Sequence, residues 1–147
     1  MIELELMGFR DRLQVKRERG QQLIFDPIRR KWLVLQPEEL VRQLLVQYLL
    51  DLGYNKNHIA IEKSLRVNDF EKRFDVLIYD KNTLPFMLIE CKAPHVDITD
   101  RAFGQITQYN LPLRVNYLLV TNGIKTYCCK MNYEEQAYTF LSKIPTF

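Results

Sequence analysis

The segment RFDVLIYDKNTLPFMLIECK, residues 73–92, decides the fold of this chain. Two apolar runs, residues 73–79 and 86–92, flank a stretch rich in turn-forming residues, and this pattern predicts two strands joined in a hairpin. Each run carries one carboxylate among residues that favour burial, Asp75 in the first and Glu90 in the second. A buried charge is costly unless it is paired, so these two residues are the first candidates for a functional site.

The register of this hairpin is predicted from its turn. If Tyr79 pairs with Phe86, Asp75 stands directly opposite Glu90 on one face of the sheet, and the β-carbons of such a pair lie about 4.5–5.5 Å apart. Two carboxylates at that separation repel each other unless a cation or a shared proton lies between them. A divalent cation such as Mg2+ takes carboxylate oxygens as ligands, and the pair therefore predicts a metal site.

The two residues after Glu90 divide between the faces of the strand. Because side chains alternate, Lys92 shares the face of Glu90, whereas Cys91 points to the opposite face and is expected in the core. An ammonium group beside a metal site can orient or deprotonate a water molecule, or stabilise charge on a phosphate. A simple salt bridge between Glu90 and Lys92 is the alternative, and the facing Asp75 favours the metal site.

The flanking sequence predicts helices and further strands around this hairpin. The predicted strands span residues 21–25, 32–35, 59–65, 115–121 and 124–130, and the predicted helices span residues 37–52 and 98–110. Asn122 and Gly123 predict a two-residue turn before the last strand, and the tail after Tyr133 is not assigned. This order predicts an α/β protein with a mixed sheet flanked by helices and an extra N-terminal β-hairpin.

The composition is that of one ordered domain. With 147 residues, of which 47% are hydrophobic and 27% charged, the chain is expected to form a single domain over residues 1–147, with its core at about residues 24–130. Its apolar stretches are shorter than the roughly 18 residues of a membrane span, and its N-terminus carries acid where a signal peptide carries base. Three cysteines make neither a disulfide framework nor a spaced zinc set. We therefore expect a cytoplasmic protein without membrane contact.

Positive charge is concentrated in residues 10–31, which hold eight basic and three acidic residues, whereas the net charge of the whole chain is +3. A basic segment of this kind can follow the phosphates of DNA. Its candidate DNA-binding residues are Arg17, Arg19, Arg29 and Arg30. A solvated surface explains the same charge equally well.

Three short stretches around the Asp75 strand carry a family resemblance. They are PEELVRQ at residues 37–43, LIECKAP at 88–94 and QITQYN at 105–110. Together they resemble the N-terminal nuclease domain of type I restriction enzyme R subunits, a member of the PD-(D/E)XK nuclease superfamily. The resemblance runs from about residue 24 to residue 126. It implies a restriction-endonuclease-like αβββαβ core and Mg2+- or Mn2+-dependent hydrolysis of DNA, as the endonuclease-like domain of a restriction-modification or related DNA-processing system.

The resemblance also implies a role for each candidate residue. Asp75 and Glu90 would ligate the metal ion, and Lys92 would assist the attacking water. Glu39, on the first predicted helix, would complete the metal environment. Helical periodicity does not choose between Glu39 and its neighbour Glu38, so the choice of Glu39 rests on the resemblance alone.

Gln105 and Tyr109 match the family's Q-x-x-x-Y pattern, by which they would position the DNA backbone or the substrate. At i and i+4 they share one face of the predicted helix, and a packing contact between helix and sheet is the alternative reading of the pair.

The sequence departs from the family in two respects. Phe74 stands where the superfamily name expects proline, and no G-x-x-x-x-G-K-[ST] phosphate loop is present, so we expect this chain to bind no ATP. Other subunits of a restriction system are therefore expected partners. The alternative to a nuclease is a catalytically inactive DNA-binding or assembly module of such a system, and hydrolysis of RNA is a third possibility.

Overall fold

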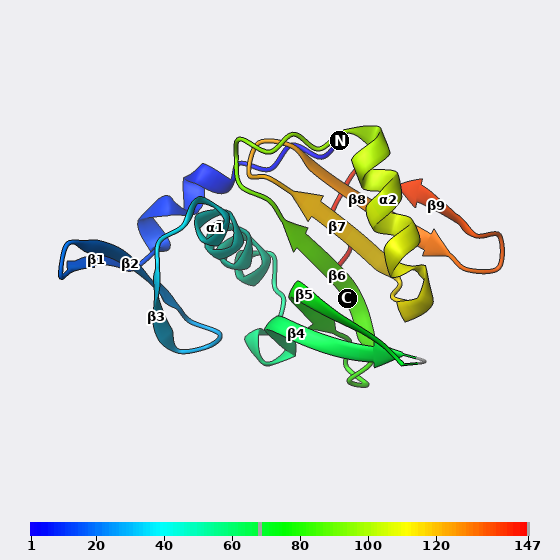
Figure 1. Cartoon of the computed structure of the whole chain (residues 1–147), viewed down its shortest axis with the longest axis horizontal. Helices are drawn as coiled ribbons and strands as arrows, with labels where there is room; N and C mark the ends of the chain where they lie inside the picture. The colour runs from blue at the N-terminus through cyan, green and yellow to red at the C-terminus, as the bar shows by residue number, and fades with distance from the viewer. Residues whose placement is uncertain (68, 147) are drawn as a thin grey trace.

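A six-stranded mixed sheet forms the centre of the protein (Figure 1). The computed structural model of the chain describes residues 1–67 and 69–146, and of residues 67, 70, 109 and 112 it describes the backbone alone. In spatial order the strands are β4 (Ile59–Val67), β5 (Phe70–Tyr79), β6 (Pro85–Cys91), β7 (Tyr117–Thr121), β8 (Thr126–Asn132) and β9 (Ala137–Phe140). Only the β6–β7 pair among these is parallel. The predicted α/β class with a mixed sheet is confirmed.

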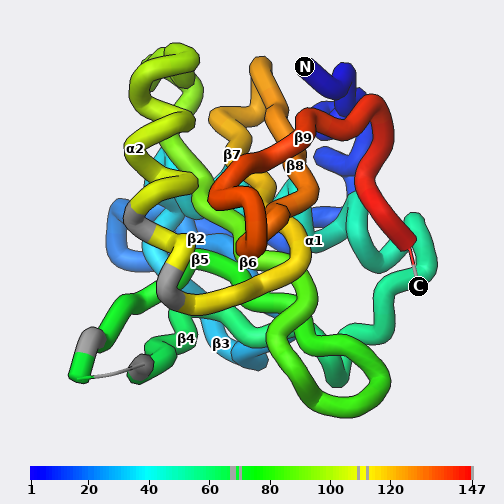
Figure 2. Tube along the Cα trace, turned by 90° about the vertical axis from the view of Figure 1, so that its right-hand side faces the viewer, coloured from blue at the N-terminus to red at the C-terminus, as the bar shows by residue number. Residues whose placement is uncertain are grey.

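Two α-helices pack on opposite faces of this sheet: α1 (Pro37–Asp51) and α2 (Asp100–Asn110). Short 3-10 helices lie at Leu6–Arg12, Lys56–His58 and Leu111–Leu113. Figure 2 shows α2 on one side of the sheet and the N-terminal segment on the other. No helix in residues 1–67 and 69–146 combines the length and apolar character that crossing a membrane requires.

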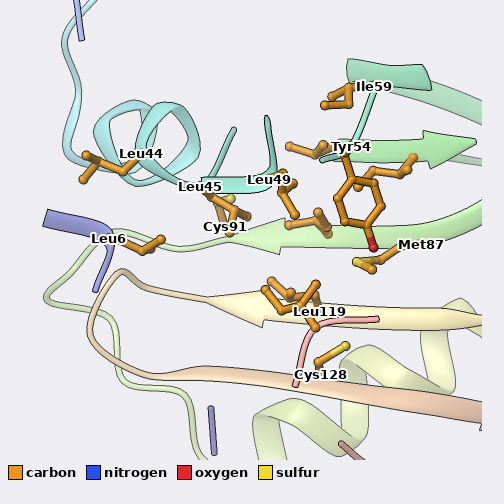
Figure 3. Packing of buried hydrophobic residues seen from close by; sticks show 14 of the residues in the cluster. Leu6, Leu44, Leu45, Leu49, Tyr54, Ile59, Met87, Cys91, Leu119 and Cys128 are labelled. Atoms are coloured by element: carbon orange, nitrogen blue, oxygen red, sulfur yellow. The ribbon is translucent and has the colours of Figure 1, made fainter. Parts of the chain in front are cut away.

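Alternation along the central strands builds two cores. Ile89 and Cys91 face α1, where they pack with Leu45 and Leu49 (Figure 3), whereas Leu88 belongs to the core beneath α2. Cys91 is 1% exposed, as its place on the strand predicts. The adjacent Cys128 and Cys129 divide between the two cores in the same way.

The predicted register holds in the body of the β5–β6 hairpin but was wrong at its turn. Val76 pairs with Ile89, in the register that places Asp75 and Glu90 at the next facing positions. Tyr79, however, pairs with Pro85 and not with Phe86, because the register shifts by one residue after Ile78. The extra residue is Phe86, which the register skips between Pro85 and Met87. The Asp80 carboxylate holds the turn before it, by accepting hydrogen bonds from the backbone N–H groups of residues 82 and 84.

The N-terminal hairpin is a three-stranded sheet that lies beside α1 (Figure 1). Its strands are β1 (Val15–Glu18), β2 (Gln21–Asp26) and β3 (Lys31–Val34). The predicted strands 21–25 and 32–35 correspond to β2 and β3. Strand β1 was missed because all four of its residues are exposed, which leaves no apolar alternation to detect.

The predicted two-residue turn at Asn122 and Gly123 was also wrong. Thr121 pairs with Thr126, which leaves a four-residue loop. The Asn122 side chain stabilises this loop by accepting hydrogen bonds from the N–H groups of residues 124 and 125. Gly123, with a φ of 88°, lies so close to Val41 of α1 that a β-carbon would be 3.3 Å from the valine methyl group.

Leu45 anchors α1 to the sheet, since its side chain is fully buried in the core beside Cys91. We predict that Leu45→Ala lowers the free energy of unfolding by about 2–5 kcal/mol, through lost burial and the cavity left behind. Leu52, which follows the last residue of the same helix, is 37% exposed. Leu52→Ala is therefore the matched control, and it should lower the free energy of unfolding by less than about 1 kcal/mol. Urea unfolding of both variants measures the difference, and equal losses would contradict this account of the core.

Candidate functional site

The candidate residues meet where β5 and β6 leave their shared ladder, next to the first turn of α1. The β4–β5 ladder is interrupted opposite Asp75, because Glu62 has a φ of 53° and drops out of the pairing between Ile61–Val76 and Lys63–Phe74. Local interruptions of this kind redirect side chains and recur near functional sites. Here the interruption brings Glu62 and Asp75 within reach of the same arginine, Arg42.

Both carboxylate oxygens of Asp75 have hydrogen-bond donors. Oδ1 accepts from Nη2 of Arg42 at 3.2 Å, and Oδ2 accepts from the backbone N–H of Cys91 at 2.7 Å. The first contact ties Asp75 to α1 and the second ties it to the end of β6. The aspartate is therefore held in one orientation by two separate elements.

Glu90 interacts electrostatically with Asp75, as the facing positions predict. Burial, together with the charge of Asp75, raises the pKa of Glu90 to about 7. Nζ of Lys72, on β5, lies 3.7 Å from Oε1 of Glu90, and both side chains are less than a fifth exposed. The expected repulsion is therefore met by side-chain cations, Arg42 at Asp75 and Lys72 at Glu90, and by a proton that Glu90 retains to higher pH.

A chain of alternating charges continues from Asp75 into the N-terminal sheet. Nη1 of Arg42 lies 2.6 Å from Oε2 of Glu39, and Nη2 of Arg29 lies 2.6 Å from the other oxygen of Glu39. Arg29 also binds Asp26 at 2.5 Å through Nε. Asp26, Glu39 and Arg42 are all less than 9% exposed, so each buried charge has a partner of opposite sign, as buried ions require.

The two glutamates of the first turn of α1 have different surroundings. Glu39 is occupied by two arginines, one on each carboxylate oxygen. Glu38 is half exposed, and burial together with the charge of Asp75 raises its pKa, while Arg42 and Lys92 act in the opposite direction. The charges of Asp75 and Lys92 thus both act on Glu38.

The donor set at Asp75 and Glu90 fits a hard divalent cation. Oε1 of Glu90 is buried and accepts no hydrogen bond, although the ammonium group of Lys72 lies 3.7 Å away as an ion-pair partner. A metal ion could take this oxygen as a ligand in place of Lys72. The described residues contain no cluster of three or more His, Cys, Asp or Glu side chains able to hold a metal ion. Mg2+ commonly binds proteins through one or two carboxylates, with water and substrate phosphate completing its shell, so a pair is sufficient.

A groove of about 400 Å3 runs beside the site on the α2 side of the sheet. Its lining residues are Lys72, Lys92, Ala102, Gln105 and Ile106. The structure thus brings Gln105 and Lys92 to the same groove, and the role of Gln105 in positioning substrate stays a prediction. Tyr109 lies on the same helix, but its side chain is outside the described part of the chain.

The four candidate DNA-binding arginines separate into two groups. Arg17, Arg19 and Arg30 are exposed on the N-terminal sheet and its turns. Arg29 is largely covered and its guanidinium is paired with three carboxylates, those of Asp26, Glu39 and Glu62. Arg29 differs from the other three because it belongs to the chain of ion pairs that joins Asp26 to Glu39.

Sequence reasoning missed Arg42 and Lys72. Arg42 could have been found, because it lies three residues after Glu39 among the apolar positions of a helix, where an unpaired charge is unfavourable. Lys72 gave no such signal, because it is eighteen residues from Glu90 and meets it only across the paired strands.

The fold and site together define an α/β protein with a pair of carboxylates and an adjacent lysine at the end of its central strands. A family model described as Type I restriction enzyme R protein N terminus matches residues 37–145. The chain belongs to this family, which confirms the resemblance seen in the sequence and indicates a role in a restriction system. A search of curated proteins found no match.

The raised pKa of Glu90 predicts a pH-dependent stability. A carboxyl whose pKa rises from 4.5 to about 7 on folding stabilises the native state fully below pH 4.5, and this contribution is lost as the pH rises through 7. Without divalent ions, the free energy of unfolding of wild type should fall over this window relative to Glu90→Gln, by on the order of 3 kcal/mol. Urea unfolding of both proteins from pH 4 to 8 tests this, and parallel profiles would contradict it.

Proposed function

We propose that this protein is a Mg2+- or Mn2+-dependent DNA phosphodiester hydrolase, the nuclease domain of a restriction system. The observation that carries the proposal is the pair Asp75 and Glu90, with Lys92 two residues further on, in a chain of this family. The element order α1, β4, β5, β6, α2, β7 supports the finer assignment to the restriction-endonuclease-like αβββαβ core. Other restriction subunits are its proposed partners, in the cytoplasm.

The proposed mechanism divides the work between the two carboxylates and the lysine. Asp75 and Glu90 would hold the divalent ion, which supplies charge stabilisation at the phosphate and acidifies a bound water. Lys92 would orient the attacking water or stabilise the charge that develops on phosphate oxygens. Arg42 and the N–H of Cys91 keep Asp75 in position for this task.

We propose Glu38 rather than Glu39 as the helix carboxylate of the site. Both oxygens of Glu39 bind arginines at 2.6 Å, so a ligand role would require breaking at least one of two buried ion pairs. Glu38 has a half-exposed side chain and its pKa responds to the charges of Asp75 and Lys92. Glu39 instead fixes Arg42, and through it Asp75.

A second candidate function is an inactive DNA-binding or assembly module. It is favoured by the ion pairs of the metal-free site, where Arg42 already neutralises Asp75 and Lys72 lies next to Glu90. A module of this kind needs the fold and the basic surface but no divalent ion. Cleavage assays separate the two functions.

We predict that the purified protein cuts linear or supercoiled DNA with Mg2+ or Mn2+, and that Lys92→Ala lowers the rate at least about a hundredfold, as expected for the loss of a group that assists proton transfer. Gel assays with both ions measure the rates, and EDTA is the control. Inert wild type and variant would favour the inactive module. Equal cutting by both would indicate a contaminating nuclease.

We further predict that the exposed arginines of the N-terminal sheet bind phosphates. Replacing Arg17, Arg19 and Arg30 with Ala should reduce the slope of log affinity against log salt by about 0.9 for each lost contact. A triple variant of the exposed Lys56, Lys81 and Lys143 carries the same charge change and is the control. Fluorescence anisotropy with duplex DNA gives both slopes, and equal slopes in the two variants would assign the segment to a solvated surface.

A further inference from the structure

Lys72 is a cation that the proposed mechanism does not use. It lies on β5, and its Nζ is 3.7 Å from Oε1 of Glu90 and 5.7 Å from the centre of the Phe74 ring. Only 15% of its side chain is exposed. The aromatic ring and the carboxylate therefore hold the ammonium group against the α2 side of the site.

The same lysine lines the groove of about 400 Å3 beside α2. Lys92 and Gln105 line it as well, and Ala102 and Ile106 contribute apolar wall. Two ammonium groups and an amide thus face one open space beside the proposed reaction centre. Ammonium and amide N–H groups are donors for phosphate oxygens, so the groove has the chemistry to take a phosphate group of a nucleic-acid strand.

A divalent cation and Lys72 compete for Glu90. An ion bound to this carboxylate would repel the ammonium group of Lys72, whose Nζ lies 3.7 Å from Oε1, since neighbouring like charges disfavour each other in a partly buried site. Metal binding therefore weakens the ion pair between Lys72 and Glu90 and favours a turn of the lysine toward a different anion. The adjoining groove, which Lys72 already lines, offers a place for that anion.

We propose that Lys72, Lys92 and Gln105 form a subsite for a backbone phosphate of the DNA strand, and that Lys72 serves it only after a divalent ion has taken Glu90. This inference rests on the proposed function, because it assigns a substrate contact to the same site. It makes Lys72 a counterion in the metal-free protein and a phosphate ligand in the metal-bound protein.

The test compares Lys72→Met with Lys130→Met, an exposed strand lysine of β8, in the full-length chain. Calorimetry should show several-fold tighter binding of Mn2+ to Lys72→Met than to wild type, because a competing cation is gone.

Stopped-flow anisotropy with short duplex DNA, read before turnover, should show about tenfold weaker binding of DNA to Lys72→Met when Mn2+ is present, which corresponds to about 1.4 kcal/mol. Without Mn2+ its DNA affinity should equal that of Lys130→Met. Lys72→Arg should restore the Mn2+-dependent DNA binding, and melting curves show that each variant is folded.

Two results would overturn the subsite: weaker Mn2+ binding by Lys72→Met, or the same loss of DNA affinity with and without Mn2+. The outcome is separable from that of the hydrolase proposal. If wild type binds Mn2+ and gains DNA affinity through Lys72 but does not cut DNA, the result contradicts the hydrolase proposal and supports the subsite. If wild type cuts DNA but Lys72 has no Mn2+-dependent effect on DNA binding, the result supports the hydrolase proposal and contradicts the subsite.

Discussion

The buried guanidinium group of Arg42 requires carboxylate partners, and these partners fix the site and the elements around it. Arg42 is 6% exposed, and its head group reaches Glu39 on its own helix and Asp75 on β5. Burial alone would lower the pKa of Arg42, but Glu39 and Asp75 raise it, so the side chain is firmly charged. Removing one partner from a buried ion pair costs about 3–5 kcal/mol. The position of α1 against the sheet and the orientation of Asp75 therefore depend on each other.

The same ions explain how acidic groups can be concentrated at the end of a sheet before any ligand binds. Asp75 is balanced by Arg42 and by the N–H of Cys91, and Glu90 by Lys72 and a raised pKa. Each carboxylate is thus stable in the folded protein, while one oxygen, Oε1 of Glu90, accepts no hydrogen bond and is balanced by the ion pair with Lys72. A site built in this way is preformed, which lowers the conformational entropy that the protein loses when a ligand binds.

The sequence was informative where its pattern was local. The two apolar runs in residues 73–92 and the helical periodicity after Pro37 predicted β5, β6 and α1, because burial leaves a local trace in the sequence. The shift at Tyr79 could not be predicted, since it skips Phe86 within β6 and ends the turn, which is held by hydrogen bonds to Asp80, one residue earlier than expected. Strand β9, in the tail that was not assigned, is exposed along its whole length and shows no alternation in burial.

The site was predictable only in part, for the same reason. Asp75 and Glu90 became candidates because charges inside strands contradict burial, and Lys92 became one because it shares the face of Glu90. The sequence could not show that Glu39 is paired with two arginines and Glu38 is not, because one of the two is Arg29, which reaches α1 from the turn after β2. Contacts between segments far apart in the chain leave no periodic trace in either segment.

The family match begins at residue 37, whereas the chain of ion pairs begins at Asp26. A boundary drawn by sequence similarity therefore cuts through an electrostatic unit, and leaves Glu39 on one side and one of its two arginines on the other. The N-terminal sheet therefore contributes two members of the chain of ion pairs, Asp26 and Arg29. In a relative that lacks this sheet, the position of Glu39 must either gain a different cation or lose its acid, so the two features should be inherited together.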